Sequence, residues 1–390
     1  MDIKGYVKYR SAAAIASQVL QSVISVTVPG MSVAAICGYG DSLVAAHSKS
    51  VHRKEENIER GAAFPTTVSV NKIVQNFSPG ASEDYVLREG DVAKIEVSVH
   101  IDGYISSAAH TTVATNSPSV TISDRRADAI SAAYYASEVA TRMIRPGQTP
   151  RNVVKAIGLV ASGFNCTVAE DTFTSQIDRF VISGKNTFAN RFNPDVVISD
   201  EAFETGEIYT VDCTISTGDG QARASEYSPT IFQRDVGQQY SLKLRTSRTL
   251  FSQVCARFSV FPFLMRDAVG DNHALKAGVG ECVRSHLLVP FAVTTEKKNG
   301  DQYVAQFKVT VVCHYTGPIR LTQALPMPNV QSATAIPAES EIGQILALDF
   351  EQAPVPELPR LKANIPAPVP TVEPTSAAGA AAAAASMDLS

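Results

Sequence analysis

Apolar and polar residues alternate along the stretch KIEVSVHIDGYISSAAHTT, residues 94–112. The alternation is interrupted at Asp102-Gly103, a dipeptide typical of two-residue hairpin turns whose backbone needs positive φ angles. Strict alternation on both sides of such a turn predicts two antiparallel strands, each with one face toward the protein core. The stretch therefore predicts a β-hairpin.

A two-residue loop at this turn also fixes the register of the hairpin. The expected opposite pairs are Ile101 with Tyr104, Val99 with Ser106, and Ser98 with Ser107. Glu96 would then lie diagonally across from Ser107, on the same face of the sheet. The hairpin is thus expected to present one carboxylate beside a serine, and this raises the question of whether the pair is part of a metal site.

Apolar residues at helical spacing predict four helices outside the hairpin. They are expected within residues 11–30, 33–51, 124–144 and 149–164. Pro-Gly pairs follow the first and third of them, and β-branched runs at 66–72 and 207–216 predict further strands. Blocks of helices and antiparallel strands indicate an α+β domain with a curved sheet. Neither GxGxxG nor GxxxxGK[ST] occurs, so the phosphate loops of nucleotide-binding folds are not expected.

The composition is that of a globular protein, with 390 residues, 45% of them hydrophobic and 18% charged. The N-terminal stretch MDIKGYVKYRS lacks the apolar region of a secretory signal. No apolar run reaches the roughly 18 residues that a membrane span needs. The six cysteines are scattered without a CxxC pair, so free buried thiols are expected rather than disulfides or a zinc site.

The C-terminal part differs in composition from the rest of the chain. From Leu321 onward there are two basic and seven acidic residues, whereas the preceding part carries a net charge of +1. Ten prolines lie between Pro326 and Pro374, followed by an alanine-rich end. This composition predicts one domain over 1–334 and a disordered tail over 335–390, apart from a short helix around 341–350. Removal of such a tail is expected to leave the melting temperature nearly unchanged.

A second unusual segment, residues 236–266, contains five basic residues and no acidic one. Its SLKLR stretch alternates, which predicts a strand with Lys243 and Arg245 on one face. Ser247 would cap a following helix whose apolar face is formed by Leu250, Phe251, Val254 and Phe258. A further helix is expected within 274–291. Both a solvated amphipathic surface and a phosphate-contacting face fit this pattern.

Six segments resemble one known family in sequence, order and spacing. They are GAAFPTTVSVNKIVQNFSP, LREGDVAKIEVSVHIDGYISSAAHT, FVISGKNTF, IYTVDCTISTGDGQA, YSLKLRTSRTLFSQV and VAQFKVTV. Together they resemble the type-2 methionine aminopeptidases and, more closely, their non-peptidase relatives, the proliferation-associated protein family. The resemblance spans residues 6–325. It implies the pita-bread fold, a pseudo-symmetric α+β core, with a helical insert at about residues 236–292.

The resemblance also indicates which residues of this sequence occupy the metal-ligand positions of the active aminopeptidases. Its five ligand positions fall on Glu96, Ser107, Ser175, Asp212 and Lys308, and an additional pocket histidine falls on Asn76. Two carboxylates, two serines and a lysine cannot offset the charge of two divalent metals. We therefore expect no metal, no cofactor and no catalytic residue, and we expect Lys308 to pair with Glu96 or Asp212. Solvated strand acids and a surviving metal site remain the alternatives.

By resemblance, the function would be that of a ribosome-associated RNA-binding protein. It would act in translation, ribosome biogenesis or growth regulation, as a monomer in the cytoplasm, with nuclear or nucleolar shuttling left open. The residues expected to contact phosphates of the large ribosomal subunit are Lys243, Arg245, Arg248 and Arg257. A divergent metallo-aminopeptidase and a protein-binding scaffold are the alternative functions. The lysine-rich tail usual in the family is replaced here by an acidic Pro/Ala-rich one.

Overall fold

The computed structural model describes residues 3–117, 119–193, 197–270, 272–297, 300–361 and 364–371. Its central hairpin consists of β3 (Val92–Ile101) and β4 (Tyr104–Val113). Asp102 and Gly103 have φ angles of 54° and 80°, as a tight two-residue hairpin turn requires. Ser98 pairs with Ser107 and Ile101 pairs with Tyr104. The predicted turn and register are both confirmed.

This hairpin is part of a large, mostly antiparallel sheet. The strand order is β1-β3-β4-β14-β8-β6-β7, with β15 and β5 attached to β14 and β8, and β16 attached to β15. The other strands of this sheet are β1 (Arg60–Val70), β5 (Thr167–Val168), β6 (Phe173–Ile177), β7 (Phe188–Ala189), β8 (Ile208–Ser216), β14 (Val304–His314), β15 (Gly317–Arg320) and β16 (Glu351–Gln352). Strands from the two ends of the chain therefore meet at β4 and β14.

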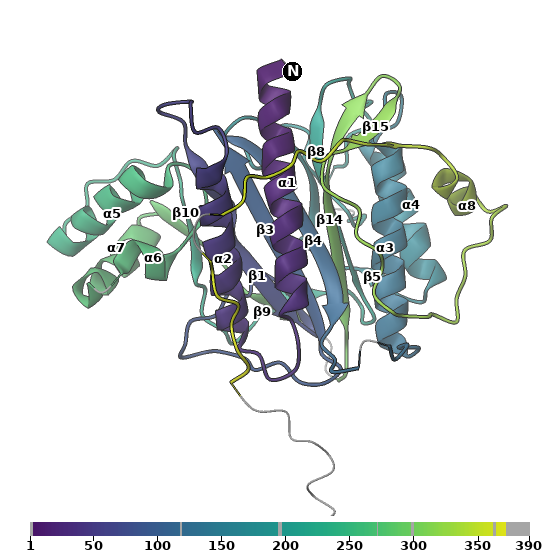
Figure 1. Cartoon of the computed structure of the whole chain (residues 1–390), viewed down its shortest axis with the longest axis horizontal. Coiled ribbons are helices and arrows are strands. Elements are labelled where there is room, and N and C mark those ends of the chain that lie inside the picture. The colour runs from purple at the N-terminus through teal and green to yellow at the C-terminus, as the bar shows by residue number, and fades with distance from the viewer. Residues whose placement is uncertain are drawn as a thin grey trace, which may run out of the picture.

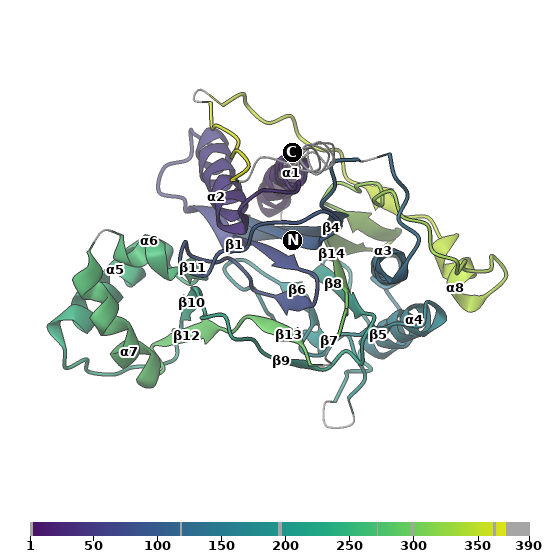
Figure 2. The same cartoon turned by 90° about the horizontal axis from the view of Figure 1, so that it is seen from below.

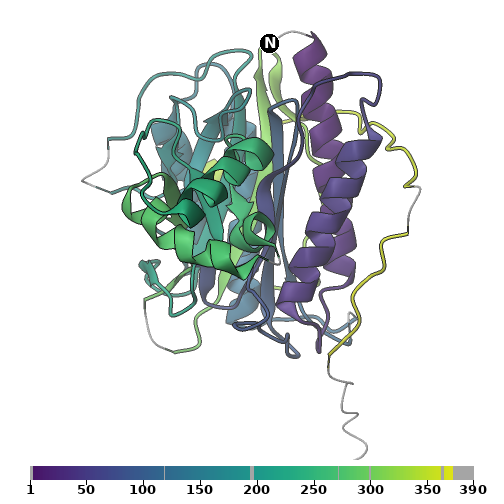
Figure 3. The same cartoon turned by 90° about the vertical axis from the view of Figure 1, so that its left-hand side faces the viewer.

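Four helices cover one face of the sheet (Figures 1 and 3). They are α1 (Ile3–Ser25), α2 (Val33–Ser50), α3 (Arg125–Met143) and α4 (Pro150–Gly163). Half of the buried residues of α3 are alanine, which lets the helix backbone lie close to the strands beneath it. α4 begins with Thr149 accepting a hydrogen bond from Asn152 N and a proline in its first turn. All four predicted helices are confirmed.

The opposite face of the sheet carries smaller elements. Two three-stranded sheets lie there, in the orders β2-β13-β9 and β11-β10-β12. Their strands are β2 (Ile73–Gln75), β9 (Ala222–Ala224), β10 (Ile231–Arg234), β11 (Phe263–Leu264), β12 (Leu288–Phe291) and β13 (Thr294–Glu296). The helices α5 (Arg245–Phe258), α6 (Met265–Val269) and α7 (Lys276–Arg284), with the 3-10 turn η1 (His273–Leu275), project to one side of the molecule (Figure 2). This projection corresponds to the expected insert, residues 236–292.

The prediction for the start of the insert is wrong in two respects. Residues 241–244 form no strand, and the helix begins at Arg245 with Leu244 in the capping position. Ser247 is a buried residue within α5 and not its cap. Two apolar residues in five are too few to distinguish a strand from an extended loop that anchors one leucine, and here Leu242 is buried whereas Leu244 is exposed.

Residues beyond 334 also contact the domain. The segment that we call the C-terminal strap, residues 335–361 and 364–371, lies against the helical face (Figure 1). The expected short helix is present as α8 (Glu341–Leu346), which packs on α3 and α4. β16 then pairs with β15 in parallel. The prediction for 372–390 lies outside the described residues.

Side chains fix the strap along its length. The ring of Phe350 lies 4.7 Å from the guanidinium carbon of Arg142 and 4.8 Å from that of Arg320. Ala353 is 1% exposed, and Thr371 N donates to Gly30 O at 2.8 Å. Proline prevents helix and sheet interiors, but it does not prevent an extended chain from docking through single apolar side chains. A proline-rich segment can therefore be held against a domain by a few single contacts.

Within the described residues, no helix has both the length and the apolar character that spanning a bilayer requires. All six cysteines are free thiols, as expected from their spacing.

Candidate functional site

Three strands bring together the charged residues singled out from the sequence. Lys308 on β14 pairs directly with Asp212 on β8 and with Ala109 on β4. Ala109 in turn pairs with Glu96 on β3. Residues that pair across neighbouring strands share one face of the sheet. The register therefore places Glu96, Asp212 and Lys308 on the same face, opposite one another.

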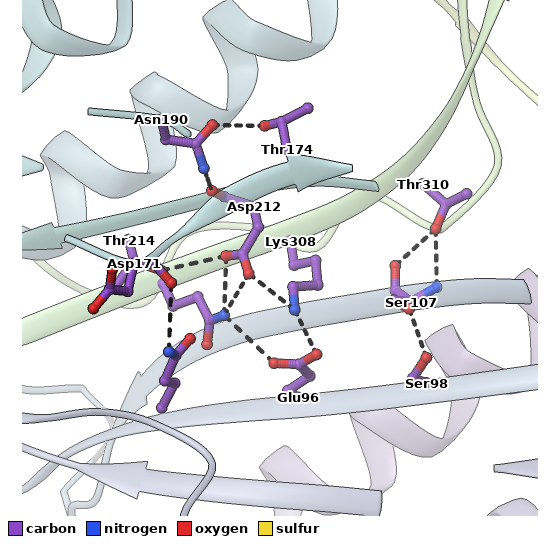
Figure 4. Close-up of polar contacts among 12 residues, drawn as sticks. Glu96, Ser98, Ser107, Asp171, Thr174, Asn190, Asp212, Thr214, Lys308 and Thr310 are labelled. Carbon is purple, nitrogen blue, oxygen red and sulfur yellow. Dashed lines mark hydrogen bonds and ion pairs between the residues drawn. The ribbon is translucent and has the colours of Figure 1, made fainter. Parts of the chain in front are cut away.

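The side chains of these residues form one ion-pair cluster, which Figure 4 shows at close range. Lys308 Nζ lies 2.5 Å from Glu96 Oε1 and 2.9 Å from Asp212 Oδ2. The side chains of Glu96, Asp212 and Lys308 are 13%, 10% and 12% exposed. A buried charge needs a partner, and each carboxylate here is bonded to the same ammonium. The lysine thus pairs with both acids at once.

A fourth residue of the cluster was not found from the sequence. Gln306 Nε2 donates to Asp212 Oδ1 at 2.9 Å and to Oδ2 at 3.1 Å. Gln306 lies two residues before Lys308, so the alternation of β14 places it on the same face. Its spacing from Lys308 indicates the face of the strand, but its contact with Asp212 depends on how β14 and β8 pair.

The electrostatics of the cluster favour a charged lysine. Burial alone lowers the pKa of an ammonium group. The two carboxylates, Asp212 and Glu96, outweigh that effect through charge attraction and hydrogen bonds, so the pKa of Lys308 lies well above its ordinary value. The cluster therefore contains a fixed positive charge at neutral pH.

The other predicted site positions lie apart from this cluster. The Ser107 hydroxyl bonds to the Ser98 hydroxyl at 2.6 Å, and the Ser107 backbone bonds to Thr310 on β14. Ser175 on β6 pairs with Thr210 on β8. Asn76 has a φ of 66° and donates to Ala292 O at 2.9 Å. Of the six positions, the structure brings together three, and the contacts of the other three are to neighbouring strands and loops.

His110 follows Ala109, the residue that pairs with Lys308. His110 on β4 is buried, and its ring packs edge-on against Phe307 at a centroid distance of 5.0 Å. Burial lowers the pKa of His110 to about 4, so the ring is neutral and its environment is that of a core residue.

The residues present do not fit the metal centre of the aminopeptidases. Across the residues that the structure describes, no group of three or more His, Cys, Asp or Glu side chains is arranged to hold a metal ion. A divalent metal bound between Glu96 and Asp212 would have to displace the Lys308 ammonium or lie within a few ångströms of it. Repulsion at that distance costs several kcal/mol even at a screened dielectric, about 4 kcal/mol per unit-charge pair.

The second candidate site is the basic surface of the insert. The side chains of Lys243, Arg245, Arg248 and Arg257 are all exposed. Arg248 Nη1 donates to Leu242 O at 3.0 Å and to Lys243 O at 2.8 Å. Arg257 Nη1 donates to Asp267 O at 2.7 Å. Lys243 and Arg245 therefore present cations to solvent, whereas Arg248 and Arg257 also bond to the insert itself.

The aromatic residues near these cations serve a different purpose. Phe251 and Phe258 pack with Leu250 and Val254 in the core of the insert. The ring of Phe258 stacks on Phe263 at a centroid distance of 4.5 Å. Base stacking needs an accessible ring face, and in this segment Tyr240 is the ring that is exposed, at 48%. Phe251 and Phe258 therefore belong to the core of the insert, whereas the four cations lie at its surface.

Comparisons with known proteins define the class of the fold. Residues 7–170 match the model of metallopeptidase family M24. A methionine aminopeptidase from Thermotoga maritima superposes with a TM-score of 0.54 at 16% identity, over 83% of this chain and 98% of that one. The structure of a thermophilic Arx1 superposes with a TM-score of 0.82 at 27% identity, over 90% of this chain and all of that one. The fold is the α+β pita-bread fold of the M24 peptidases.

Two relatives of similar sequence indicate to which branch of the M24 superfamily the chain belongs. ERBB-3 binding protein 1 from Solanum tuberosum is 37% identical over 343 residues, which is 87% of this chain and 87% of that protein. Proliferation-associated protein A from Dictyostelium discoideum is 36% identical over 329 residues, or 84% of each chain. The chain belongs to the proliferation-associated protein family, a branch of the M24 superfamily that is related to the methionine aminopeptidases and to Arx1.

Proposed function

We propose that this chain is a catalytically inactive member of the aminopeptidase fold that binds RNA of the large ribosomal subunit. It would act in translation, ribosome biogenesis or growth regulation. The observation that carries the proposal is the double ion pair of Lys308 with Glu96 and Asp212. The cation that these two carboxylates would share in an aminopeptidase is supplied here by a side chain of the protein.

Catalysis by an active metallo-aminopeptidase depends on a metal-activated water held between the metal ligands. An ammonium group can neutralise Glu96 and Asp212, but it has no vacant coordination position for a water or a peptide carbonyl. Ser107 and Ser175 offer hydroxyl oxygens, which are weak ligands at neutral pH. These features support a role in binding rather than in peptide cleavage.

The charge of the insert supports nucleic acid as the bound partner. Residues 236–292 contain seven basic and three acidic residues, although the whole chain has a net charge of −4. Exposed cations favour contacts to the phosphate backbone, which supply most of the sequence-independent affinity for nucleic acids. Family resemblance supports the ribosome as the source of that RNA.

Co-sedimentation tests the proposal. The purified protein is mixed with isolated large subunits, isolated small subunits or whole ribosomes, and the pelleted fraction is measured. We expect binding to large subunits and whole ribosomes that weakens as salt is raised, with little binding to small subunits. Equal recovery in the presence and absence of ribosomes would contradict the proposal.

The alternative of a divergent metallo-aminopeptidase is tested separately by its metal content. We expect the dialysed protein to retain less than one cobalt, manganese, iron or zinc ion per chain and to leave Met-Ala peptides uncleaved. One or more retained ions per chain, together with cleavage, would establish an enzyme in place of the binding protein.

A further inference from the structure

An acidic residue lies beneath the basic segment at the start of the insert. Glu281 belongs to α7 and is 9% exposed. Its Oε1 accepts a hydrogen bond from Lys243 N at 2.7 Å, and its Oε2 accepts one from Leu244 N at 3.1 Å. Both oxygens of the carboxylate thus bond to the backbone of the segment that carries the exposed cations.

This contact places a negative charge beside the start of α5. Leu244 occupies the capping position of α5 and has no side chain that could accept a hydrogen bond. The backbone N–H groups at the start of a helix need acceptors, and a negative charge near them is favourable. The Ser247 hydroxyl and then the N–H groups of Lys243 and Leu244 hold the pKa of Glu281 below its usual range. The carboxylate is therefore charged at neutral pH and bound to the segment.

The distance between the two helices is fixed by a glycine in α7. A Cβ atom at Gly278 would lie 2.7 Å from Ser247 N and 2.8 Å from Ser247 Cα. Only a residue without a side chain permits α7 to approach the backbone of α5 this closely. Gly278 and Glu281 lie one turn apart on α7, so close packing at the first brings the carboxylate of the second to residues 243 and 244.

We infer that Glu281 is a positioning residue for RNA binding, because it sets the backbone from which Lys243 and Arg245 point. The inference rests on the proposed function. By charge alone, removing an acid from among phosphate-binding cations should strengthen RNA binding. A positioning role predicts the opposite effect when that acid is removed.

The sign of the effect provides the test. Large-subunit affinity is measured by co-sedimentation for the wild type, Glu281→Ala, Glu281→Gln and Gly278→Ala. We expect Glu281→Ala to bind at least about fivefold more weakly, the scale of removing hydrogen bonds to a charged group. Glu281→Gln retains one acceptor oxygen and should fall between the wild type and Glu281→Ala. Gly278→Ala changes no charge and should also weaken binding. Unchanged or tighter binding by both Glu281 variants would overturn the inference.

A matched control separates positioning from a general loss of stability. Val254 is fully buried in the core of the insert and bonds to neither residue 243 nor residue 244. Val254→Ala should lower the stability of the insert and leave the affinity of the folded fraction within about twofold of the wild type. If Val254→Ala weakens binding as much as Glu281→Ala at equal folded fraction, the effect is one of stability and the inference fails.

Hydrogen exchange distinguishes failure of this inference from failure of the proposed function. In the free protein, Glu281→Ala should accelerate exchange of the amides of Lys243 and Leu244 while leaving those in β3 and β14 unchanged. If the wild type does not bind large subunits, the proposed function falls, and exchange still decides whether Glu281 fixes the segment. Unchanged exchange at both amides would overturn the positioning role by itself.

Discussion

The Lys308 ammonium lies 2.5 Å from the carboxylate of Glu96, a residue 212 positions earlier in the chain. The same nitrogen lies 2.9 Å from Asp212 on the neighbouring strand. One lysine therefore connects β3, β14 and β8. The remaining consequences of the structure depend on this arrangement and on the surface of the insert.

Replacing Lys308 by methionine should strongly destabilise the fold. The variant would leave two carboxylates close together and largely buried without a cation. Breaking a buried ion pair by removing one partner typically costs about 3–5 kcal/mol. The free energy of unfolding in urea, compared with that of the wild type at pH 7, measures the effect.

The triple variant Lys308→Met/Glu96→Gln/Asp212→Asn is the matched control. It removes the charges together and should recover most of the stability, because no buried charge is then unpaired. A Lys308→Met protein within about 1 kcal/mol of the wild type would show that the cluster is solvated and that its charges do not depend on one another.

The pH dependence of this stabilisation follows from the raised pKa of Lys308. The folded pKa lies above the ordinary value of 10.5, so the folded state holds this proton more tightly than the unfolded chain does. The contribution is therefore complete below 10.5 and is lost only as the pH rises through the folded value. We expect the stability difference between the wild type and Lys308→Met to stay nearly constant from about pH 7 to pH 9. A difference that disappears across this range would contradict a tightly paired lysine.

Restoring the ligand types should create metal affinity. The variant Ser107→Asp/Ser175→His/Lys308→Glu would supply, with Glu96 and Asp212, four carboxylates and one imidazole. Single or double restoration should do much less, because the two metals share ligands and charge. Isothermal titration with cobalt or manganese measures the affinity. If the triple variant binds metal no better than the wild type, these positions do not converge on one site.

Deleting the C-terminal strap should destabilise the domain. Truncation after Pro337 removes α8, the ring of Phe350 between its two arginines, and the buried Ala353. We expect the melting temperature to fall by more than about 5 °C, which corresponds to roughly 2–4 kcal/mol for a domain of this size. Truncation after Thr371 is the control, since the difference between the two truncations isolates the strap. Equal melting temperatures for both would show that the strap contributes little.

Arg248 should differ from its basic neighbours in how it affects binding. It bonds to the carbonyls of Leu242 and Lys243, so Arg248→Ala should loosen the insert and weaken ribosome binding through that loosening. Lys243→Ala removes only an exposed cation and should reduce the salt slope of binding by about one unit. Circular dichroism and thermal melts of both variants measure the distinction. A melting temperature for Arg248→Ala equal to that of Lys243→Ala would contradict it.

The parts of the structure that local sequence determines could be predicted. The hairpin follows from alternation and the Asp102-Gly103 turn, and the four helices follow from apolar spacing and capping residues. Gln306 could not be found in this way, because its contact with Asp212 depends on how β14 and β8 pair. The loop at 241–244 was misread as a strand because it depends on Glu281, which lies nearly forty residues further along. For Gln306 and for the loop at 241–244, the local structure depends on contacts with residues that are distant in the sequence, and residue type alone does not reveal such contacts.

Ribosome binding by a quadruple variant tests the central claim most directly. Lys243→Ala/Arg245→Ala/Arg248→Ala/Arg257→Ala, first shown to be folded by circular dichroism, is co-sedimented with large subunits across a salt series beside the wild type. Each phosphate that the variant no longer neutralises should reduce the slope of log affinity against log salt by about one unit, so we predict much weaker binding and a slope smaller by up to about four units. Unchanged affinity with an unchanged slope would contradict the account, because the basic surface of the insert would then not contact RNA.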